Sequence, residues 1–400
     1  MLTRLGGDEF AGGDDPMGLG HCNRRDAIRG TLAAVAATSW VEGLALADDA
    51  PPGLLVRKAE PLNAEPPLDR LDSWITPIDR FFIRSHQPQP EHVPDAPVKV
   101  GGLVDQPRSY GPADLRKMES VTIPAVLQCT GNGRTRFNPI PGGVGWGQGA
   151  VGNAEWTGVR LRDLLERAGL AKGAKHVHLR GRDEPAGPKD AIYLRSLPIE
   201  RAMNPSTIVA FTMNGKDLPA MHGGPVRLVV PGWTGNHWIK WLREITVAED
   251  EAPGTFQRVD YRLPKTPQPR DAVVKPEDTV PVTALNVKSI LTAPHPRPSA
   301  EAAKAPLQGF AWTGNGRVAK VEVSIDDGPW KSAELVGPDH EGAWRMWRFA
   351  WDVTMGEHHV RVRATDTTGA VQPDVTPWNK GGYLWNGIES VKFLVDTPGK

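Results

Sequence analysis

The stretch from Val121 to Arg134 reads V-T-I-P-A-V-L-Q-C-T-G-N-G-R. Its apolar first half has the composition of a β-strand that ends at Cys129, and a glycine-rich turn follows at once. A strand end can present a side chain to a pocket, while Gly131 and Gly133 let the backbone approach a bulky partner closely. Arg134 adds a positive charge that could contact an anion. The stretch therefore predicts either a buried structural cysteine or a cysteine that acts as a ligand or nucleophile.

The two cysteines of the chain differ in their setting. Cys22 lies in a segment that resembles a twin-arginine leader, with N-R-R-D-A-I-R (Asn23 to Arg29), a mildly apolar stretch and A-L-A (Ala45 to Ala47) in that order. We expect residues 1–47 to be a signal peptide that sends the folded protein to the periplasm. Cleavage after Ala47 would leave Cys129 as a single thiol, which cannot form an internal disulfide.

The composition excludes some classes of partner. Lysine plus arginine number 47 and aspartate plus glutamate also number 47, so no basic excess indicates binding to nucleic acid or to a membrane surface. No apolar run reaches the roughly 18 residues that a membrane-spanning helix needs. A length of 400 residues suits two ordinary globular domains.

The first part of the chain, from Leu54 to about Pro264, mixes strand and helix patterns. The clearest helix pattern is V-R-L-R-D-L-L-E-R-A-G-L (Val159 to Leu170), whose apolar residues recur at i, i+3, i+4 and i+7 before a stop at Gly169. I-V-A-F-T-M-N-G-K-D-L-P, from Ile208, predicts a strand that runs into an Asn-Gly turn. This region is therefore predicted to be α+β.

The second part of the chain has an all-β pattern. The proline-rich stretch R-L-P-K-T-P-Q-P-R (Arg262 to Arg270) marks the change. Beyond it, K-V-E-V-S-I-D-D-G-P-W (Lys320 to Trp330) and H-H-V-R-V-R-A-T-D (His358 to Asp366) alternate apolar and polar residues, the first with a turn at Asp327-Gly328. We expect an α+β domain over residues 48–264, a linker over 265–282 and an immunoglobulin-like β-sandwich over 283–400.

Three motifs resemble those of the sulfite oxidase family. L-Q-C-T-G-N-G-R is similar to its molybdenum-ligating segment, R-F-F-I-R-S-H (Arg80 to His86) to its F-F-x-R-N-H with Ser85 in place of Asn, and H-G-G-P-V-R (His222 to Arg227) to a third conserved segment. The likeness extends over nearly the whole mature chain. It implies a sulfite-oxidase-type molybdopterin-binding domain, a molybdenum–molybdopterin cofactor, a β-sandwich dimerisation domain and a homodimer.

The resemblance also assigns roles to individual residues. It implies that Cys129 is the metal ligand, and that the catalytic residues are Arg84, Arg134, Trp146 and Tyr261. Cofactor-binding residues would be Phe82, His86, Asp183, His222, Arg227, Trp238 and Lys240. The pattern of residues agrees in two places: Phe82, Arg84 and His86 would share one face of an extended strand. His222, Arg227 and Lys240, with Gly232 and Gly235, offer cations and N–H donors for a phosphate.

The activity that the resemblance implies is oxidation of sulfite to sulfate by oxygen-atom transfer. The chain has no C-x-x-C-H haem motif, so we expect the electrons to pass to an external acceptor such as a c-type cytochrome. One departure weakens the match: Gly381 stands where animal sulfite oxidases have an arginine, and Lys380 is the only nearby cation. A sulfane dehydrogenase acting on protein-bound sulfur and a secreted, non-catalytic binding protein with an immunoglobulin-like module are the alternatives.

Export is the first property that can be tested. Changing Arg24 and Arg25 together to lysine should leave a cofactor-loaded precursor in the cytoplasm, because the twin-arginine route reads the paired arginines. Cell fractionation followed by immunoblotting measures this. Normal export of the double variant would rule out the twin-arginine assignment.

Overall fold

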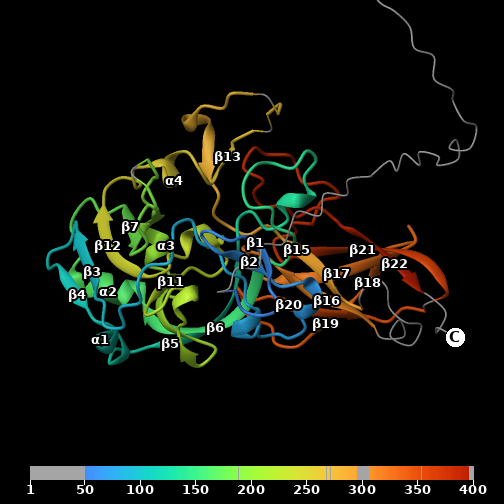
Figure 1. The fold of residues 1–400 in the computed structure, drawn as a ribbon, viewed down its shortest axis with the longest axis horizontal. Coiled ribbons are helices and arrows are strands. Elements are labelled where there is room, and N and C mark those ends of the chain that lie inside the picture. Colours follow the sequence, from blue (N-terminus) through green and yellow to red (C-terminus); the bar gives the residue numbers. More distant parts are fainter. Residues whose placement is uncertain are drawn as a thin grey trace, which may run out of the picture. The chain divides into compact units, whose positions relative to one another are not determined.

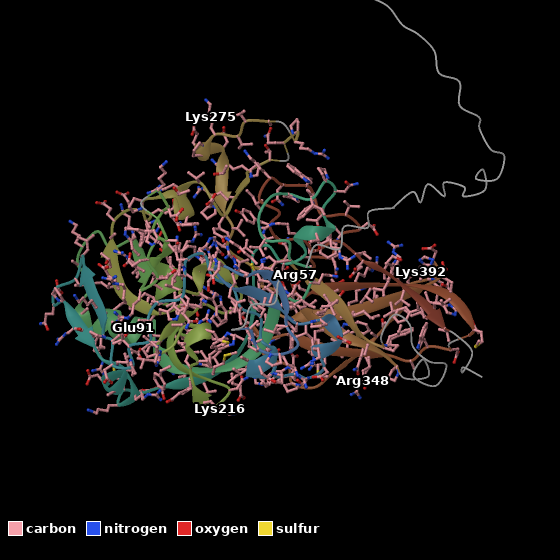
Figure 2. The ribbon with its side chains drawn as sticks, viewed as in Figure 1. Arg57, Glu91, Lys216, Lys275, Arg348 and Lys392 are labelled. Atoms are coloured by element: carbon pink, nitrogen blue, oxygen red, sulfur yellow. The ribbon has the colours of Figure 1, made fainter. Side chains whose placement is uncertain are left out.

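The computed structural model describes residues 50–187, 189–266, 268–270, 272–294, 306–352 and 354–395. The expected signal peptide and Cys22 lie outside these residues. All of the described residues belong to one compact unit, Leu44–Lys400. Figure 1 shows the strands before β13 and those from β15 onward as two neighbouring groups within that unit. In Figure 2, the labelled side chains of Lys275, Arg348 and Lys392 project outward from the ribbon.

Two five-stranded sheets make up the first group. The first sheet has the order β10-β9-β6-β5, with β11 also paired to β9. Its strands are β5 (Val121–Gln128), β6 (Val151–Arg160), β9 (Ile208–Met213), β10 (Lys216–Asp217) and β11 (Arg227–Val229). The second sheet has the order β4-β3-β12-β7-β8. Its strands are β3 (Val98–Gly102), β4 (Arg108–Tyr110), β7 (His176–Gly181), β8 (Leu194–Pro198) and β12 (Leu242–Ala248).

Short helices and one hairpin complete this group. They are β1 (Leu55–Lys58), β2 (Asn63–Glu65), α1 (Pro112–Arg116), α2 (Leu161–Ala168), α3 (Ile199–Ala202) and α4 (Thr255–Arg258). Helix α2 confirms the predicted helix, and it buries the four residues that recur at helical spacing, Leu161, Leu164, Leu165 and Ala168. It begins two residues later than predicted because β6 continues to Arg160. It ends at Ala168, and the next residue, Gly169, has a φ of 72° in the left-handed region. No helix among the described residues is long and apolar enough to cross a membrane.

The second group is a sandwich of two four-stranded antiparallel sheets, in the orders β15-β16-β20-β19 and β18-β17-β21-β22. The strands are β15 (Lys288–Ala293), β16 (Leu307–Trp312), β17 (Val318–Ile325), β18 (Lys331–Ser332), β19 (Glu334–Val336), β20 (Arg345–Phe349), β21 (Gly356–Asp366) and β22 (Ser390–Val395). The alternating pattern correctly predicted β17 and β21. The turn after β17 lies one residue earlier than predicted, because Asp326 and Asp327 are the residues with positive φ.

The proline-rich stretch does not run as a plain linker. A small ribbon forms where β13 (Arg262–Pro264) pairs with β14 (Thr279–Pro281). The boundaries that we expected for the domains stay predictions.

A separate apolar cluster joins the two groups of strands. Val126 of β5 and Val151 of β6 pack in it with Leu285, Ile290 and Phe310 of the second group. Hydrogen bonds cross the same junction: the Nε1 of Trp312 donates to the Oε1 of Gln128 at 2.6 Å. The second group therefore packs directly against the end of β5, where Cys129 follows.

Candidate functional site

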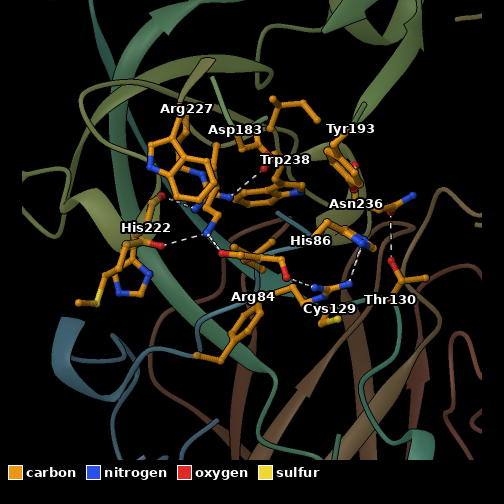
Figure 3. A pocket seen from close by; sticks show the side chains of 18 of the residues that line it. Arg84, His86, Cys129, Thr130, Asp183, Tyr193, His222, Arg227, Asn236 and Trp238 are labelled. Carbon is orange, nitrogen blue, oxygen red and sulfur yellow. Dashed lines mark hydrogen bonds between the residues drawn. The ribbon is translucent and has the colours of Figure 1, made fainter. Parts of the chain in front are cut away.

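One pocket gathers most of the residues that the sequence pointed to (Figure 3). It lies where the segment after β2, the end of β5 and the loops before and after β11 converge. Ten of the twelve predicted site residues line it: Phe82, Arg84, His86, Cys129, Asp183, His222, Arg227, Trp238, Lys240 and Tyr261. The space between the lining atoms, open solvent at the mouth included, is about 720 Å³.

Cys129 is the first residue beyond β5. The pairing of β5 with β6 runs to Gln128 and Val151, and the backbone N–H of Cys129 then donates to the carbonyl of Ala150 at 2.9 Å. A turn closes at once, because the N–H of Asn132 donates to the Cys129 carbonyl at 2.9 Å. Cys129 is 7% exposed and has no disulfide partner among the described residues. Its side chain is thus fixed at a strand end and lines the pocket.

Arg84 lies near Cys129, and its guanidinium donates to several nitrogen and oxygen acceptors. Its Nη1 donates to the Oδ1 of Asn63 at 3.0 Å, and its Nη2 lies 2.9 Å from the Nε2 of His86. Burial lowers the pKa of Arg84, but the nearby Tyr261, Cys129 and Tyr193 outweigh that effect, and the net pKa is raised. Arg84 therefore stays charged at every physiological pH.

The other members of this network are neutral. Burial, and then the charge of Arg84, hold the pKa of His86 well below its usual range. Burial raises the pKa of Tyr261 to about 12. The Tyr261 hydroxyl makes a short contact with the Nε2 of His86. A neutral imidazole and an un-ionised phenol beside one guanidinium leave the network with a net positive charge.

The segment that carries Arg84 is not the regular strand that we expected. Only Ile83 makes a bridge, to Ala64. The residues predicted to share one face do all line the pocket, but Phe81, just before them, and Ser85, between Arg84 and His86, line it as well. Because the backbone here is not a regular strand, the alternating pattern predicted the residues that face the pocket only in part.

The pocket holds three further basic side chains: His222 and Arg227, which are buried, and Lys240, which is half-buried. Arg227 donates to the carbonyls of His222 at 2.8 Å and Trp238 at 3.1 Å. The Nζ of Lys240 donates to the Oγ of Ser85 at 2.7 Å and to the Met221 carbonyl at 3.1 Å. Neither cation has a carboxylate partner within salt-bridge distance among the described residues, since their acceptors are all neutral oxygens.

Burial dominates the titration of these groups. It lowers the pKa of His222 to about 3 and that of Arg227 to about 9, and it holds the pKa of Lys240 well below its usual range. Asp183 is the nearest acid, and burial raises its pKa to about 6 although Lys240 pulls it down. Buried cations without matching negative charge are costly. The cluster is therefore suited to an anionic group that enters the pocket.

Gly232 and Gly235 were expected to bring backbone N–H donors to this cluster. Gly235 does line the pocket, and a Cβ there would lie 3.0 Å from the Gln128 carbonyl. Gly232 has another role: its φ is 79°, and its nearest neighbour is the Gly314 carbonyl of the second group of strands. It is not among the residues that line the pocket, because the loop passes beside Gly314 at this point.

Arg134 and Trp146 are the two predicted site residues that do not line the pocket. Arg134 is 8% exposed, and its guanidinium donates to the carbonyls of Val144 at 2.8 Å and Gly381 at 2.9 Å. Trp146 is fully buried and packs edge-on against Phe82 at 6.4 Å between ring centroids. Both lie just behind the wall, and their roles in catalysis stay predictions.

The sequence did not point to Tyr193 and Asn236, which also line the pocket. The Tyr193 ring stacks on His86 with centroids 4.8 Å apart, and its hydroxyl donates to the Asn236 carbonyl at 2.9 Å. Asn236 follows Gly235 in the glycine-containing loop, so its position in T-G-N-H was an available signal. Tyr193 gave none, since an alternating A-I-Y-L-R segment is typical of any edge strand.

The chain matches two protein families. The family described as "Oxidoreductase molybdopterin binding domain" matches residues 86–256, and the family "Mo-co oxidoreductase dimerisation domain" matches residues 279–393. The chain is 38% identical to a sulfite oxidase of Gallus gallus over 354 residues, which cover 83% of this chain and 76% of the relative. It is 36% identical to the mitochondrial sulfite oxidase of Homo sapiens, covering 86% of this chain and 66% of that protein.

A solved structure is similar over the same range. The sulfane dehydrogenase SoxCD from Paracoccus pantotrophus superposes with a TM-score of 0.70 and 29% identity, covering 82% of this chain and 84% of that chain. The expected order of a molybdopterin-binding domain followed by a dimerisation domain is confirmed.

The buried cations make a prediction about anions. Inorganic phosphate should raise the unfolding temperature of protein prepared without cofactor, because it supplies the missing negative charge. At a concentration of 100 times its Kd, a ligand adds about 2.7 kcal/mol to the free energy of unfolding. Lys240→Met should abolish most of this shift in a thermal unfolding assay. Lys216→Met, at an exposed position on β10, is the control and should keep the full shift. An equal shift in all three proteins would show that phosphate acts elsewhere.

Proposed function

The chain belongs to the sulfite oxidase family of molybdopterin oxidoreductases, and on that premise we propose that it oxidises sulfite to sulfate. The observation that carries the proposal is the sharing of one pocket by Cys129, the charged Arg84 network and the cluster of basic side chains His222, Arg227 and Lys240. A molybdenum–molybdopterin cofactor bound there would supply the transferable oxygen atom and accept two electrons.

The residues of the pocket fit that cofactor. A cysteine thiolate is a soft ligand suited to a transition metal, and Cys129 is held at a strand end with its side chain in the cavity. Arg227 and Lys240, with the neutral His222 beside them, would hold the phosphate of the pterin, because neither Arg227 nor Lys240 has a carboxylate partner. Asp183 and the indole of Trp238 line the same wall and offer a hydrogen-bond partner and a flat surface for the ring system.

Arg84 is the residue that we assign to sulfite. Its guanidinium keeps its charge and carries planar N–H donors that match an oxyanion. His86 and Tyr261 hold it from one side, and both are neutral, so they add donors without adding repulsion to the dianion. Arg134 donates only to carbonyls here, so a direct contact with sulfite would require those bonds to be exchanged.

The setting of the reaction is part of the proposal. We place the enzyme in the periplasm, exported by the twin-arginine leader, as a homodimer formed through its second domain. The sequence has no haem motif, so the electrons would go to a separate acceptor, and a c-type cytochrome is suited to that compartment. The paired arginines near the N-terminus and the match to a dimerisation domain support these assignments.

A sulfane dehydrogenase is the second candidate. The similarity to SoxCD favours it, and so does Gly381, which leaves the pocket without a side-chain cation at that position. Steady-state assays with sulfite and ferricyanide, compared with a protein-bound sulfur substrate, separate the two activities. A non-catalytic binding protein would contain no molybdenum, whereas either enzyme should contain about one atom per chain.

Replacing Arg84 by glutamine tests the sulfite site. The change removes a fixed charge, and we expect kcat/KM for sulfite to fall by about 2–4 kcal/mol of transition-state binding. Arg80→Gln is the matched control, because Arg80 is four residues away and pairs with Asp72 at the surface. Unchanged sulfite kinetics in Arg84→Gln, with molybdenum still bound, would show that Arg84 has a structural role only.

Cys129→Ser tests the metal ligand. Serine is nearly isosteric, so β5 and its turn should persist, but the hard and poorly ionised hydroxyl is a weak metal ligand. We expect the thiolate-to-metal absorption band and nearly all sulfite turnover to be lost while the pterin is retained. A structural cysteine would instead cost about 1–3 kcal/mol of stability and leave the folded fraction active. An active but less stable variant would therefore contradict the assignment.

A further inference from the structure

Tyr261 contributes its hydroxyl to the pocket from an unusual backbone conformation. Its φ is 54°, in the left-handed region that bulky residues rarely adopt. Such a conformation persists only where the surroundings impose it. On the carbonyl side, the N–H of Val282 donates to the Tyr261 carbonyl at 2.8 Å. Other groups must hold the ring and the backbone N–H of Tyr261 if its hydroxyl is to reach His86.

Two side chains enclose the Tyr261 ring. The guanidinium of Arg195 lies over one part of it, with Cζ 5.4 Å from the ring centroid. Tyr383 stacks on it with centroids 5.2 Å apart and an angle of 21° between the planes. The hydroxyl of Tyr383 also accepts a hydrogen bond from the Tyr261 N–H at 3.3 Å. Tyr383 thus contacts both the ring and the backbone of Tyr261.

Tyr383 is itself fixed by its own loop. The Oδ1 of Asn379 accepts from the Tyr383 N–H at 2.8 Å, and the Nδ2 of Asn379 donates to the Tyr383 carbonyl at 2.9 Å. The loop is anchored to the cysteine turn as well, because the N–H of Leu384 donates to the Thr130 carbonyl at 2.9 Å. The placement of Tyr383 is therefore determined before any ligand enters the pocket.

Gly381 is what leaves room for the Tyr383 ring. A Cβ at position 381 would lie 2.1 Å from Cε2 of Tyr383, far inside van der Waals contact. No left-handed φ is needed at Gly381, so the requirement for glycine comes from the ring alone. The same Gly381 offers its carbonyl to Arg134 at 2.9 Å. The absence of a side chain at position 381 is therefore what allows the Tyr383 ring, two residues later, to occupy its place.

We propose that Tyr383 is a positioning residue for the substrate pocket, which directs the Tyr261 hydroxyl toward His86 and Arg84 by stacking on its ring and bonding to its backbone N–H. The proposal rests on the proposed function, because it assigns Tyr383 a role in capturing the oxyanion. Tyr383 acts through Tyr261, so its contribution should vanish when the Tyr261 hydroxyl is absent.

A double-mutant cycle on the molybdenum-loaded protein measures this dependence. Tyr383→Leu should lower kcat/KM for sulfite about tenfold in the wild-type background, and less than about twofold in the Tyr261→Phe background. Tyr383→Phe keeps the stacking and should restore most of the activity. Gly381→Ala keeps Tyr383 but displaces its ring, and it should reproduce the loss with the same dependence on Tyr261. Equal losses in both backgrounds would overturn the proposal.

A matched control and a second readout complete the experiment. Tyr110→Leu makes the same chemical change on β4, the edge strand of the β4-β3-β12-β7-β8 sheet. It should leave the sulfite kinetics unchanged. The same cycle is run on the Kd for sulfate, measured by isothermal titration calorimetry, so that it does not depend on turnover. Absence of sulfite oxidation in the wild type would refute the proposed function, and the sulfate cycle would then decide the role of Tyr383 by itself. If the wild type binds no sulfate either, both proposals are wrong.

Discussion

Buried positive charge without matching negative charge is the constraint on which this pocket depends. Arg227 and Lys240 are surrounded by carbonyl and hydroxyl oxygens, and burial lowers the pKa of both. The nearest carboxyl, Asp183, pays its own desolvation cost, with its pKa raised to about 6. A chain that folds into this arrangement without a ligand gives up stability that an anion would restore. Stable folding and cofactor loading are therefore linked by the electrostatics of one wall.

The groups around Arg84 meet a different electrostatic requirement. Arg84 stays charged, while His86 and Tyr261 beside it stay neutral across the physiological range. The two neutral groups orient the guanidinium without cancelling its field. The pocket thus has one cation cluster suited to a permanently bound anion and one single charge suited to an oxyanion that must enter and leave.

The sequence predicted the parts that local pattern controls. Helix α2 and strand β21 follow from periodicity, because each buries the residues that recur at its own spacing. Strand β9 follows from a continuous apolar run before its Asn-Gly turn, and it is buried at five of its six positions. Ten of the predicted site residues line one pocket, and family motifs marked them in the sequence. The positions of Arg134 and Gly232 were not predictable, since both depend on contacts with residues more than eighty positions away, Gly381 and Gly314. Tyr193 lacked any local signal for the same reason.

Contacts from the second group of strands explain why those residues could not be placed by pattern alone. On one side, the turn after Cys129 is held by hydrogen bonds between residues of the turn itself. On the other side it meets Trp312, which donates to Gln128, and Leu384, which donates to Thr130. The Trp385 ring lies so close to Gly133 that a Cβ there would be 2.8 Å from Cε3, and Gly133 has a φ of 87° that also favours glycine. The glycine-rich turn thus serves packing against the sandwich, and the position of Cys129 is defined by both groups of strands together.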